Sequence, residues 1–294
     1  MTVSITPETP DFVAKVTDVD LTQSLSNDDF AAIEDAFNHY AVLEFPDQPL
    51  DDDQQSAFSE RFGPLERMIT DALGGTPSVI SLSNIDEDGD LLDTGDARAL
   101  FLSGNRYWHT DSSFKVVPAM ASALSARQVP PEGGETEYAD MRAAYDALPD
   151  TLKAEIADLE AEHSYGYSQG KISLDAMSEE EQDALPPVIH PMVRVHPASG
   201  RKALYIGRHA SHILGRPIED GRALLAELLE HATQDRFIYS HSWQVGDLVM
   251  WDNRAVLHRG RAWDESRYKR IMHRTTIAGE GGDNPWLVDQ VSSG

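Results

Sequence analysis

Three residues of metal-binding types stand out in this sequence, two of them close together. His109 and Asp111 are two residues apart in the stretch WHTDSSF, so in an extended strand both side chains would point to one face. His258 follows an apolar run that ends at Trp251, which puts it just past a buried strand. Two histidines and one carboxylate, with coordination positions left open, form the facial triad of non-haem iron(II) oxygenases. These residues therefore predict a catalytic iron site.

Each of the three residues alone has a plainer explanation. A chain with 11 histidines and 50 acidic residues brings a histidine close to an aspartate by chance. A surface or core histidine beside an acid is therefore the commoner origin of the pair formed by His109 and Asp111. His258 alone could equally cap a helix or strand or form a salt bridge. The prediction of a metal site therefore depends on all three residues together.

Two arginines could hold an anion near such a site. Arg270 and Arg274 are four residues apart, so they share one face of an extended strand. Arginine offers a planar fork of N–H donors that binds a carboxylate through two hydrogen bonds. In so acidic a chain, a surface salt bridge is an equally good explanation for either arginine alone.

The hydrophobic periodicity predicts many short strands with helices outside them. Helices are predicted at residues 27–40, 51–62, 141–148, 149–162 and 219–232. Strands are predicted at residues 41–45, 78–83, 119–129, 135–139, 188–196, 202–206, 244–251 and 269–277. Polar composition predicts a loop at 85–104 and a candidate lid at 164–187. This pattern favours a mainly β fold with peripheral helices, a sandwich or jelly roll, in a single domain over 1–294.

The composition excludes several classes of protein. A net charge of −26 repels nucleic acids and anionic membranes. The absence of cysteine excludes disulfides, thiolate zinc sites, iron–sulfur clusters and cysteine nucleophiles. No apolar run is long enough to span a membrane, and the N-terminal residues do not look like a signal peptide. We therefore expect a cytoplasmic protein without nucleic-acid or membrane partners, and we further expect a homo-oligomer.

Four motifs in order along nearly the whole chain resemble one enzyme family. They are His109-x-Asp111, then Gly133-Gly134-Glu135-Thr136, then Trp251-Asp252-Asn253-Arg254 with His258, and finally Arg270 to Arg274. This set resembles the TauD/TfdA family of iron(II)- and 2-oxoglutarate-dependent dioxygenases. The stretches DMRAAYDALP, LLAELLEHATQ and VGDLVMWDNR look most similar to the 2,4-dichlorophenoxyacetate dioxygenase branch. The resemblance implies a double-stranded β-helix, the jelly roll.

The resemblance also implies a role for each matching residue. His109, Asp111 and His258 would hold Fe(II) and leave positions for 2-oxoglutarate and O2. The far carboxylate of 2-oxoglutarate would bind Arg270 and the hydroxyl of Thr136. By the same resemblance, the anionic substrate would be held at two further positions, Arg274 and Asn105.

The same resemblance implies a small organic acid as substrate. In the phenoxyacetate branch, hydroxylation next to the ether oxygen yields a phenol and glyoxylate, a step in the breakdown of aromatic compounds. The position at which taurine-specific members carry a histidine is Met68 here, which weakens taurine as the substrate. An alkylsulfonate or another carboxylate is the alternative within the family. Trp108 and Phe114 could wall the pocket or belong to the core.

Two motifs suggest functions outside this class. Gly166-Tyr167-Ser168-Gln169-Gly170 matches the G-x-S-x-G elbow of serine hydrolases, but a helix is predicted before it and a polar segment after it. Asn84-x-Asp86-x-Asp88-Gly89 resembles the start of a calcium loop, but its twelfth position is Gly95 in place of glutamate. A serine hydrolase using Ser168 and a calcium-binding protein are the competing hypotheses, and neither explains the spaced histidines, aspartate and arginines.

Overall fold

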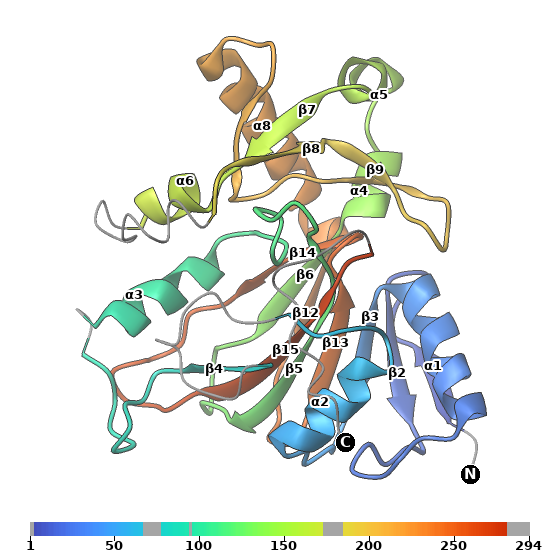
Figure 1. The fold of residues 1–294 in the computed structure, drawn as a ribbon, viewed down its shortest axis with the longest axis vertical. Helices are drawn as coiled ribbons and strands as arrows, with labels where there is room; N and C mark the ends of the chain where they lie inside the picture. Colours follow the sequence, from blue (N-terminus) through green and yellow to red (C-terminus); the bar gives the residue numbers. More distant parts are fainter. Residues whose placement is uncertain (1–2, 67–77, 94–95, 173–184, 281–294) are drawn as a thin grey trace, which may run out of the picture.

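The computed structural model describes residues 3–66, 78–93, 96–172 and 185–280 (Figure 1). Its strands are β1 Ser4–Pro7, β2 Val13–Thr17, β3 Val42–Phe45, β4 Val79–Ser83, β5 Ala119–Gln128, β6 Thr136–Asp140, β7 Glu160–His163, β8 Val188–Pro191, β9 Val193–Val195, β10 Lys202–Leu204, β11 Ala210–Ile213, β12 Ile238–His241, β13 Leu248–Asp252, β14 Val256–Gly260 and β15 Ile271–Ala278. Its helices are α1 Asn27–Tyr40, α2 Asp52–Glu60, α3 Ala97–Ser103, α4 Met141–Asp146, α5 Asp150–Ile156, α6 Tyr165–Gly170 and α8 Ile218–Ala232, with short 3-10 turns at Gly104–Arg106 (η2) and Asp235–Phe237 (η3).

Two sheets form the centre of the molecule. The larger has seven strands in the order β1-β2-β3-β13-β5-β15-β4, and the smaller has the order β12-β6-β14. One apolar cluster joins them, because Leu124, Val249 and Trp251 of the large sheet pack with Tyr138 and Val256 of the small one. The two sheets therefore face each other across a shared core, which confirms the predicted jelly roll.

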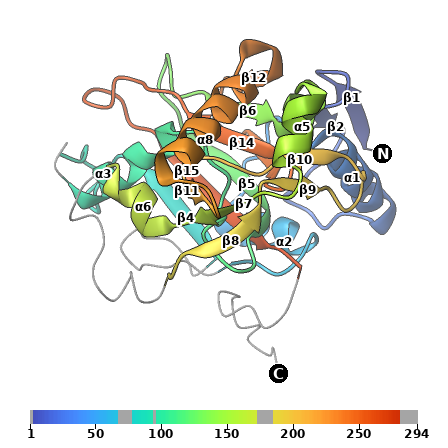
Figure 2. The same cartoon turned by 90° about the horizontal axis from the view of Figure 1, so that it is seen from above.

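Helices cover the outer faces of this sandwich. Ile33 and Phe37 of α1 and Phe58 of α2 pack on the large sheet. On the far side of the small sheet, a second cluster joins Leu257 of β14 to Leu228 of α8, and it also includes residues of α4. Figure 1 shows α1 and α2 beside the large sheet, with α4, α5, α8 and β7 to β9 gathered at the upper end of the molecule. Figure 2 shows the molecule from above, with α5 and α8 toward the viewer. None of the helices in the described ranges is long and apolar enough to cross a membrane.

Local signals explain where the first two helices begin and end. The Ser26 hydroxyl accepts a hydrogen bond from the backbone N–H of Asp29 at the start of α1, and Ala41 ends the helix in the left-handed region at φ 71°. Asp51 and Gln54 form a reciprocal capping box at the start of α2. Both predicted helices are confirmed, although α2 ends at Glu60, two residues before the predicted end.

Two sequence predictions were wrong in part, and a third is not tested by the described residues. The predicted loop at 85–104 contains α3, which begins after Asp96, whose carboxylate accepts from the backbone N–H of Arg98. The helix predicted at 149–162 stops at Ile156, and β7 follows because it pairs with β8 and β11. The candidate lid at 164–187 begins with α6, but residues 173–184 lie outside the described residues. The lid therefore stays a prediction.

A buried cluster of one imidazole and two carboxylates ties the two sheets together. His241 of β12 bonds through Nδ1 to Glu44 of β3 and through Nε2 to Asp247, just before β13. Tyr239 donates to the same Glu44 carboxylate at 2.7 Å, and the positive charge of Lys15 also lies near it. Burial alone lowers the pKa of His241, but its bonds to Asp247 and Glu44 outweigh burial and hold the pKa above 6.5.

This cluster predicts how stability depends on pH. Because the pKa of His241 is raised in the folded state, its contribution is fully present below 6.5 and is lost as pH rises through the raised value. We expect the free energy of unfolding of the wild type to fall over that range, and that of a His241→Gln variant to fall less. Urea unfolding at a series of pH values measures both, and parallel pH profiles would contradict the assignment.

Candidate metal centre

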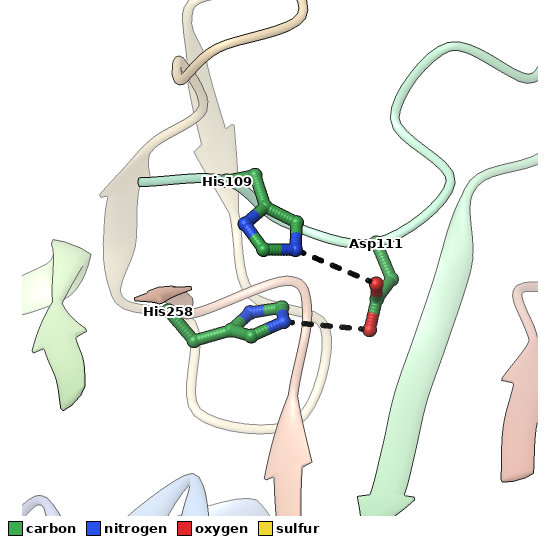
Figure 3. Close-up of side chains that lie close together, drawn as sticks. All are labelled: His109, Asp111 and His258. Carbon is green, nitrogen blue, oxygen red and sulfur yellow. Dashed lines mark ion pairs between the residues drawn. The ribbon is translucent and has the colours of Figure 1, made fainter. Parts of the chain in front are cut away.

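The backbone brings the three predicted ligands together. His109 and His258 form an antiparallel bridge in which the N–H of each donates to the carbonyl of the other, at 3.1 and 2.8 Å. The Nε2 atoms of His109 and His258 lie 3.9 and 3.7 Å from the carboxylate oxygens of Asp111 (Figure 3). All three side chains are buried, and one ligand atom from each lies within 4.8 Å of the others. The predicted triad is thus assembled from segments 147 residues apart.

The local setting of these residues differs from the sequence prediction. His258 follows the buried strand β13, as predicted, but it lies within the next strand, β14, opposite Tyr138 of β6. Asp111 lies in a turn after the bridge at His109, so the two do not share one continuous strand. Ser112, next to Asp111, has φ 56°, and this left-handed turn follows the ligand directly. The expected convergence is correct, although its strand premise was wrong.

Surrounding hydrogen bonds orient the ligand atoms. Nδ1 of His109 lies 2.7 Å from the carbonyl of Tyr107, so a proton on Nδ1 is donated there and Nε2 is left as the metal-binding atom. Asp111 accepts from the Ser122 hydroxyl at Oδ2 and from Arg274 Nη1 at Oδ1, both at 2.7 Å. Ser122 accepts in turn from the Asn253 amide. These two hydrogen bonds hold the carboxylate in place while its oxygens face the two imidazoles.

The charge states suit a divalent cation. Burial lowers the pKa of His109 to about 4 and lowers that of His258 well below 6.5. Burial alone raises the pKa of Asp111, but the Arg274 guanidinium is the largest of the effects that outweigh burial and lower the pKa below 3.8. Two neutral imidazoles and one carboxylate are deprotonated and ready at neutral pH, which metal binding requires. Iron(II) would give this set a net charge of +1, so the residues present fit the metal.

A cavity of about 340 Å³ opens beside the triad. Its lining includes His109 and His258, and also Asn105, Thr136, Arg270 and Arg274, so Asp111 is the one predicted site residue that does not line it. Much of the remaining wall is apolar and comes from Leu82, Leu91, Leu92, Leu102, Leu124, Trp251 and Trp263. Trp108 and Phe114 are not part of the lining. Trp108 belongs to the core under α8, and the Phe114 ring packs against Tyr165 and His209.

A Gly-Gly turn comes shortly before Thr136, which lines this cavity. Gly133 and Gly134 have φ 77° and 74°, a region that side chains rarely adopt. A Cβ on Gly133 would lie 2.6 Å from the carbonyl oxygen of Ala262, and one on Gly134 would lie 3.2 Å from Arg270 Nε. The turn therefore lets the chain pass close to Arg270 before β6 begins at Thr136.

Arg270 is a buried cation beside Thr136. It is 9% exposed, and its guanidinium lies 5.3 Å from the centre of the Trp263 ring. Its Nε has no hydrogen-bond partner among the described residues, and burial lowers its pKa to about 10. A buried guanidinium without a bound carboxylate is costly, and an anion in the cavity would offset that cost.

Arg274 has a carboxylate partner that the sequence did not reveal. Its Nη1 donates to Asp111, so it touches the metal carboxylate as well as lining the cavity. Asn105 lies on η2 and also lines the cavity. Met68 and Gly95 lie outside the described residues. Sequence reasoning also missed Ser122, because a serine in a buried strand carries no signal of its own.

The structure tests the two competing motifs. A strand, β7, precedes Ser168, which corrects the predicted helix, but Ser168 lies within α6 and not at a turn between strand and helix. It is 1% exposed and donates its proton to the carbonyl of Tyr165, although His209 Nδ1 lies 2.9 Å away. In the other motif, Asp86 accepts from the backbone of Asp88 and Asp90, which closes a local turn. Among the described residues, His109, Asp111 and His258 are the group whose ligand atoms lie close enough together to hold a metal ion.

Comparison with known proteins places this site in a family. The family model of taurine catabolism dioxygenase TauD, TfdA family, matches residues 4–276. Alpha-ketoglutarate-dependent 2,4-dichlorophenoxyacetate dioxygenase of Cupriavidus pinatubonensis is 46% identical over 283 residues, covering 94% of this chain and 98% of that protein. (S)-phenoxypropionate/alpha-ketoglutarate-dioxygenase of Sphingobium herbicidovorans is 40% identical and covers 94% and 95% of the two chains.

A solved structure agrees with these relatives. The crystal structure of AAD-2 in complex with Mn(II) and N-oxalylglycine superposes with a TM-score of 0.88 at 44% identity, covering 98% of this chain and all of that one. The chain belongs to the TauD/TfdA family. It is an iron(II)- and 2-oxoglutarate-dependent dioxygenase, which confirms the enzyme class and the cofactors, Fe(II), 2-oxoglutarate and O2, that its motifs implied.

Proposed function

We propose that this dioxygenase hydroxylates an aryloxyalkanoate of the phenoxyacetate type at the carbon next to the ether oxygen. The observation that carries the proposal is a cavity with an apolar wall that is also lined by two arginines and by the metal-ligand histidines His109 and His258. An aryl ring fits the leucine and tryptophan wall, and a carboxylate fits the arginines. Relatives named for 2,4-dichlorophenoxyacetate and phenoxypropionate support the same class of substrate.

The protein's part in the reaction is to bind and orient. We assign His109, Asp111 and His258 as metal ligands, and Arg270 with Thr136 as the site for the far carboxylate of 2-oxoglutarate. Bound iron supplies the centre at which O2 is reduced while 2-oxoglutarate loses CO2 and becomes succinate. The hydroxylated product is a hemiacetal, which collapses to a phenol and glyoxylate. No protein acid or base is needed for that collapse in water.

Arg274 and Asn105 are assigned to the substrate. Arg274 has five N–H donors, so it can bind the substrate carboxylate while it keeps its bond to Asp111. Asn105, which lines the same cavity, offers an amide to the same group. The hydrogen bond to Asp111 holds the Arg274 guanidinium close to the metal ligands. A substrate carboxylate bound to Arg274 would therefore bring the adjacent carbon, the one to be hydroxylated, close to the metal.

Arg274→Ala is expected to raise the KM for phenoxyacetate more than the KM for 2-oxoglutarate. Loss of a charged hydrogen-bond partner costs about 1.5–3 kcal/mol, which is roughly a 10- to 150-fold effect. The variant also loses its contact with Asp111, so we expect kcat to fall as well. Steady-state succinate release with each substrate varied in turn measures the split, and equal losses for both would contradict the assignment.

A substrate panel tests the proposed class. Wild-type protein with Fe(II) and 2-oxoglutarate is expected to release succinate fastest with phenoxyacetates, together with equimolar phenol and glyoxylate. Faster succinate release with alkylsulfonates would favour the alternative within the family. Activity that resists chelators and is abolished by Ser168→Ala would instead favour a serine hydrolase.

Three further features stay predictions. They are a single domain over 1–294, a homo-oligomer, and a cytoplasmic location. The family model over residues 4–276 and the core shared by the two sheets support the single domain. Light scattering after size exclusion would measure the oligomeric state.

A further inference from the structure

The Thr136 hydroxyl, assigned above to the far carboxylate of 2-oxoglutarate, also has a hydrogen-bond partner within the protein, and this partner lies outside the cavity. The indole Nε1 of Trp243 donates to Thr136 Oγ1 at 3.0 Å. Trp243 follows β12, and the last residue of that strand, His241, pairs with Thr136 across the small sheet. Thr136 lines the cavity, whereas Trp243 does not, so the indole lies behind the hydroxyl.

The hydrogen bond from Trp243 determines whether the Thr136 hydroxyl donates or accepts in this pair. An indole N–H is only a donor, so Oγ1 must be the acceptor in this pair. The hydroxyl proton is therefore left for a different partner, and no acceptor within the described residues takes it. The hydroxyl faces a cavity that also holds Arg270, which makes an anion in that cavity the natural acceptor.

The buried His241 ring holds the Trp243 indole in place. The His241 ring contacts the Trp243 ring edge to face, with centroids 4.5 Å apart and planes at 80°. His241 is itself bonded through both ring nitrogens, to Glu44 and to Asp247. Glu44 belongs to the large sheet and Asp247 to the loop before β13. Their bonds to His241 therefore fix the position of Trp243 relative to both sheets.

We propose that Trp243 is a positioning residue for the co-substrate. Its indole N–H occupies the acceptor side of Thr136 Oγ1 and turns the hydroxyl proton toward the far carboxylate of 2-oxoglutarate. The bond also polarises the hydroxyl, which makes it a better donor. This inference rests on the proposed function, because it takes Thr136 and Arg270 as the carboxylate site. It adds a third residue, one that never touches the ligand.

Calorimetric titration of 2-oxoglutarate into the Mn(II)-loaded protein without oxygen tests the proposal by binding alone. Trp243→Phe keeps an aromatic ring next to His241 and removes the indole N–H together with part of the ring volume. It is expected to raise the dissociation constant about three- to tenfold, the effect of one neutral hydrogen bond. Thr136→Val should weaken binding at least as much. In the Thr136→Val background, Trp243→Phe should add almost nothing, because both changes remove the same interaction.

Steady-state kinetics and a control variant separate positioning from general damage. Trp243→Phe is expected to raise the KM for 2-oxoglutarate and to leave the KM for phenoxyacetate unchanged. Tyr239→Phe removes a hydrogen bond from the same Glu44 cluster but leaves the indole contact, so its affinity for 2-oxoglutarate should match the wild type.

Two outcomes would overturn the inference. One is wild-type affinity in Trp243→Phe, and the other is full additivity with Thr136→Val. Both differ from failure of the proposed function, which would appear as wild-type protein that releases no succinate with any member of the substrate panel.

Discussion

Asp111→Ala is expected to lose iron binding and 2-oxoglutarate turnover together. The substitution removes the anionic ligand and leaves two neutral imidazoles beside the Arg274 guanidinium, which repels a cation. Loss of a residue that only orients a ligand costs about 10- to 100-fold in metal affinity. Loss of the ligand itself should exceed that range, so succinate release should fall to background. Fe(II) titration without oxygen and succinate assays measure the two effects.

Ser122→Ala is the matched comparison for this prediction. It removes one hydrogen bond to Asp111 and keeps all three ligands. We expect it to weaken metal binding within the 10- to 100-fold range, roughly, and to recover turnover at high iron concentration. If Asp111→Ala bound Fe(II) as tightly as Ser122→Ala does, the triad would not be the metal site.

Arg270→Gln is expected to raise the dissociation constant for 2-oxoglutarate by more than any substitution outside the triad. Its guanidinium is buried and lines the cavity, so an ion pair with the co-substrate would form away from water. Truncating one partner of such a pair costs about 2–5 kcal/mol, which is roughly 30- to several thousand-fold in binding. Arg270→Lys keeps the positive charge but loses the planar fork of donors, so its dissociation constant for 2-oxoglutarate should lie between those of the wild type and Arg270→Gln. Calorimetry on the Mn(II)-loaded protein measures each value.

Arg216→Gln is the control for the loss of a positive charge. Arg216 pairs with Glu155 at 2.9 Å on the surface, and such exposed pairs contribute little. Its affinity for 2-oxoglutarate should match the wild type. An Arg270→Gln variant that behaved like this control would show that the far carboxylate binds elsewhere.

Local signals in the sequence predicted much of the fold. The boundaries of α1 were correct because Ser26 caps its start and an acidic first turn precedes a regular apolar face. By contrast, β7 has the sequence EAEH, which carries no strand propensity, and it becomes a strand only because β8 and β11 pair with it. Pairing of that kind depends on the whole chain and leaves no local trace.

The residues of the site could be predicted from the sequence, but several contacts between them could not. The ligands and the arginines could be predicted because their order and spacing match a family across nearly the whole chain. The bridge between His109 and His258, the bond from Arg274 to Asp111 and the indole behind Thr136 could not. Each joins residues more than 100 positions apart, and nothing in the local sequence marks them as neighbours.

A crystal structure with Mn(II) and N-oxalylglycine tests the central claim most directly. We predict one peak of anomalous density between the Nε2 atoms of His109 and His258 and the carboxylate of Asp111. The far carboxylate of the analogue should then lie on Arg270 and Thr136. A metal peak at any other group, or an analogue carboxylate bound away from Arg270, would contradict the claim.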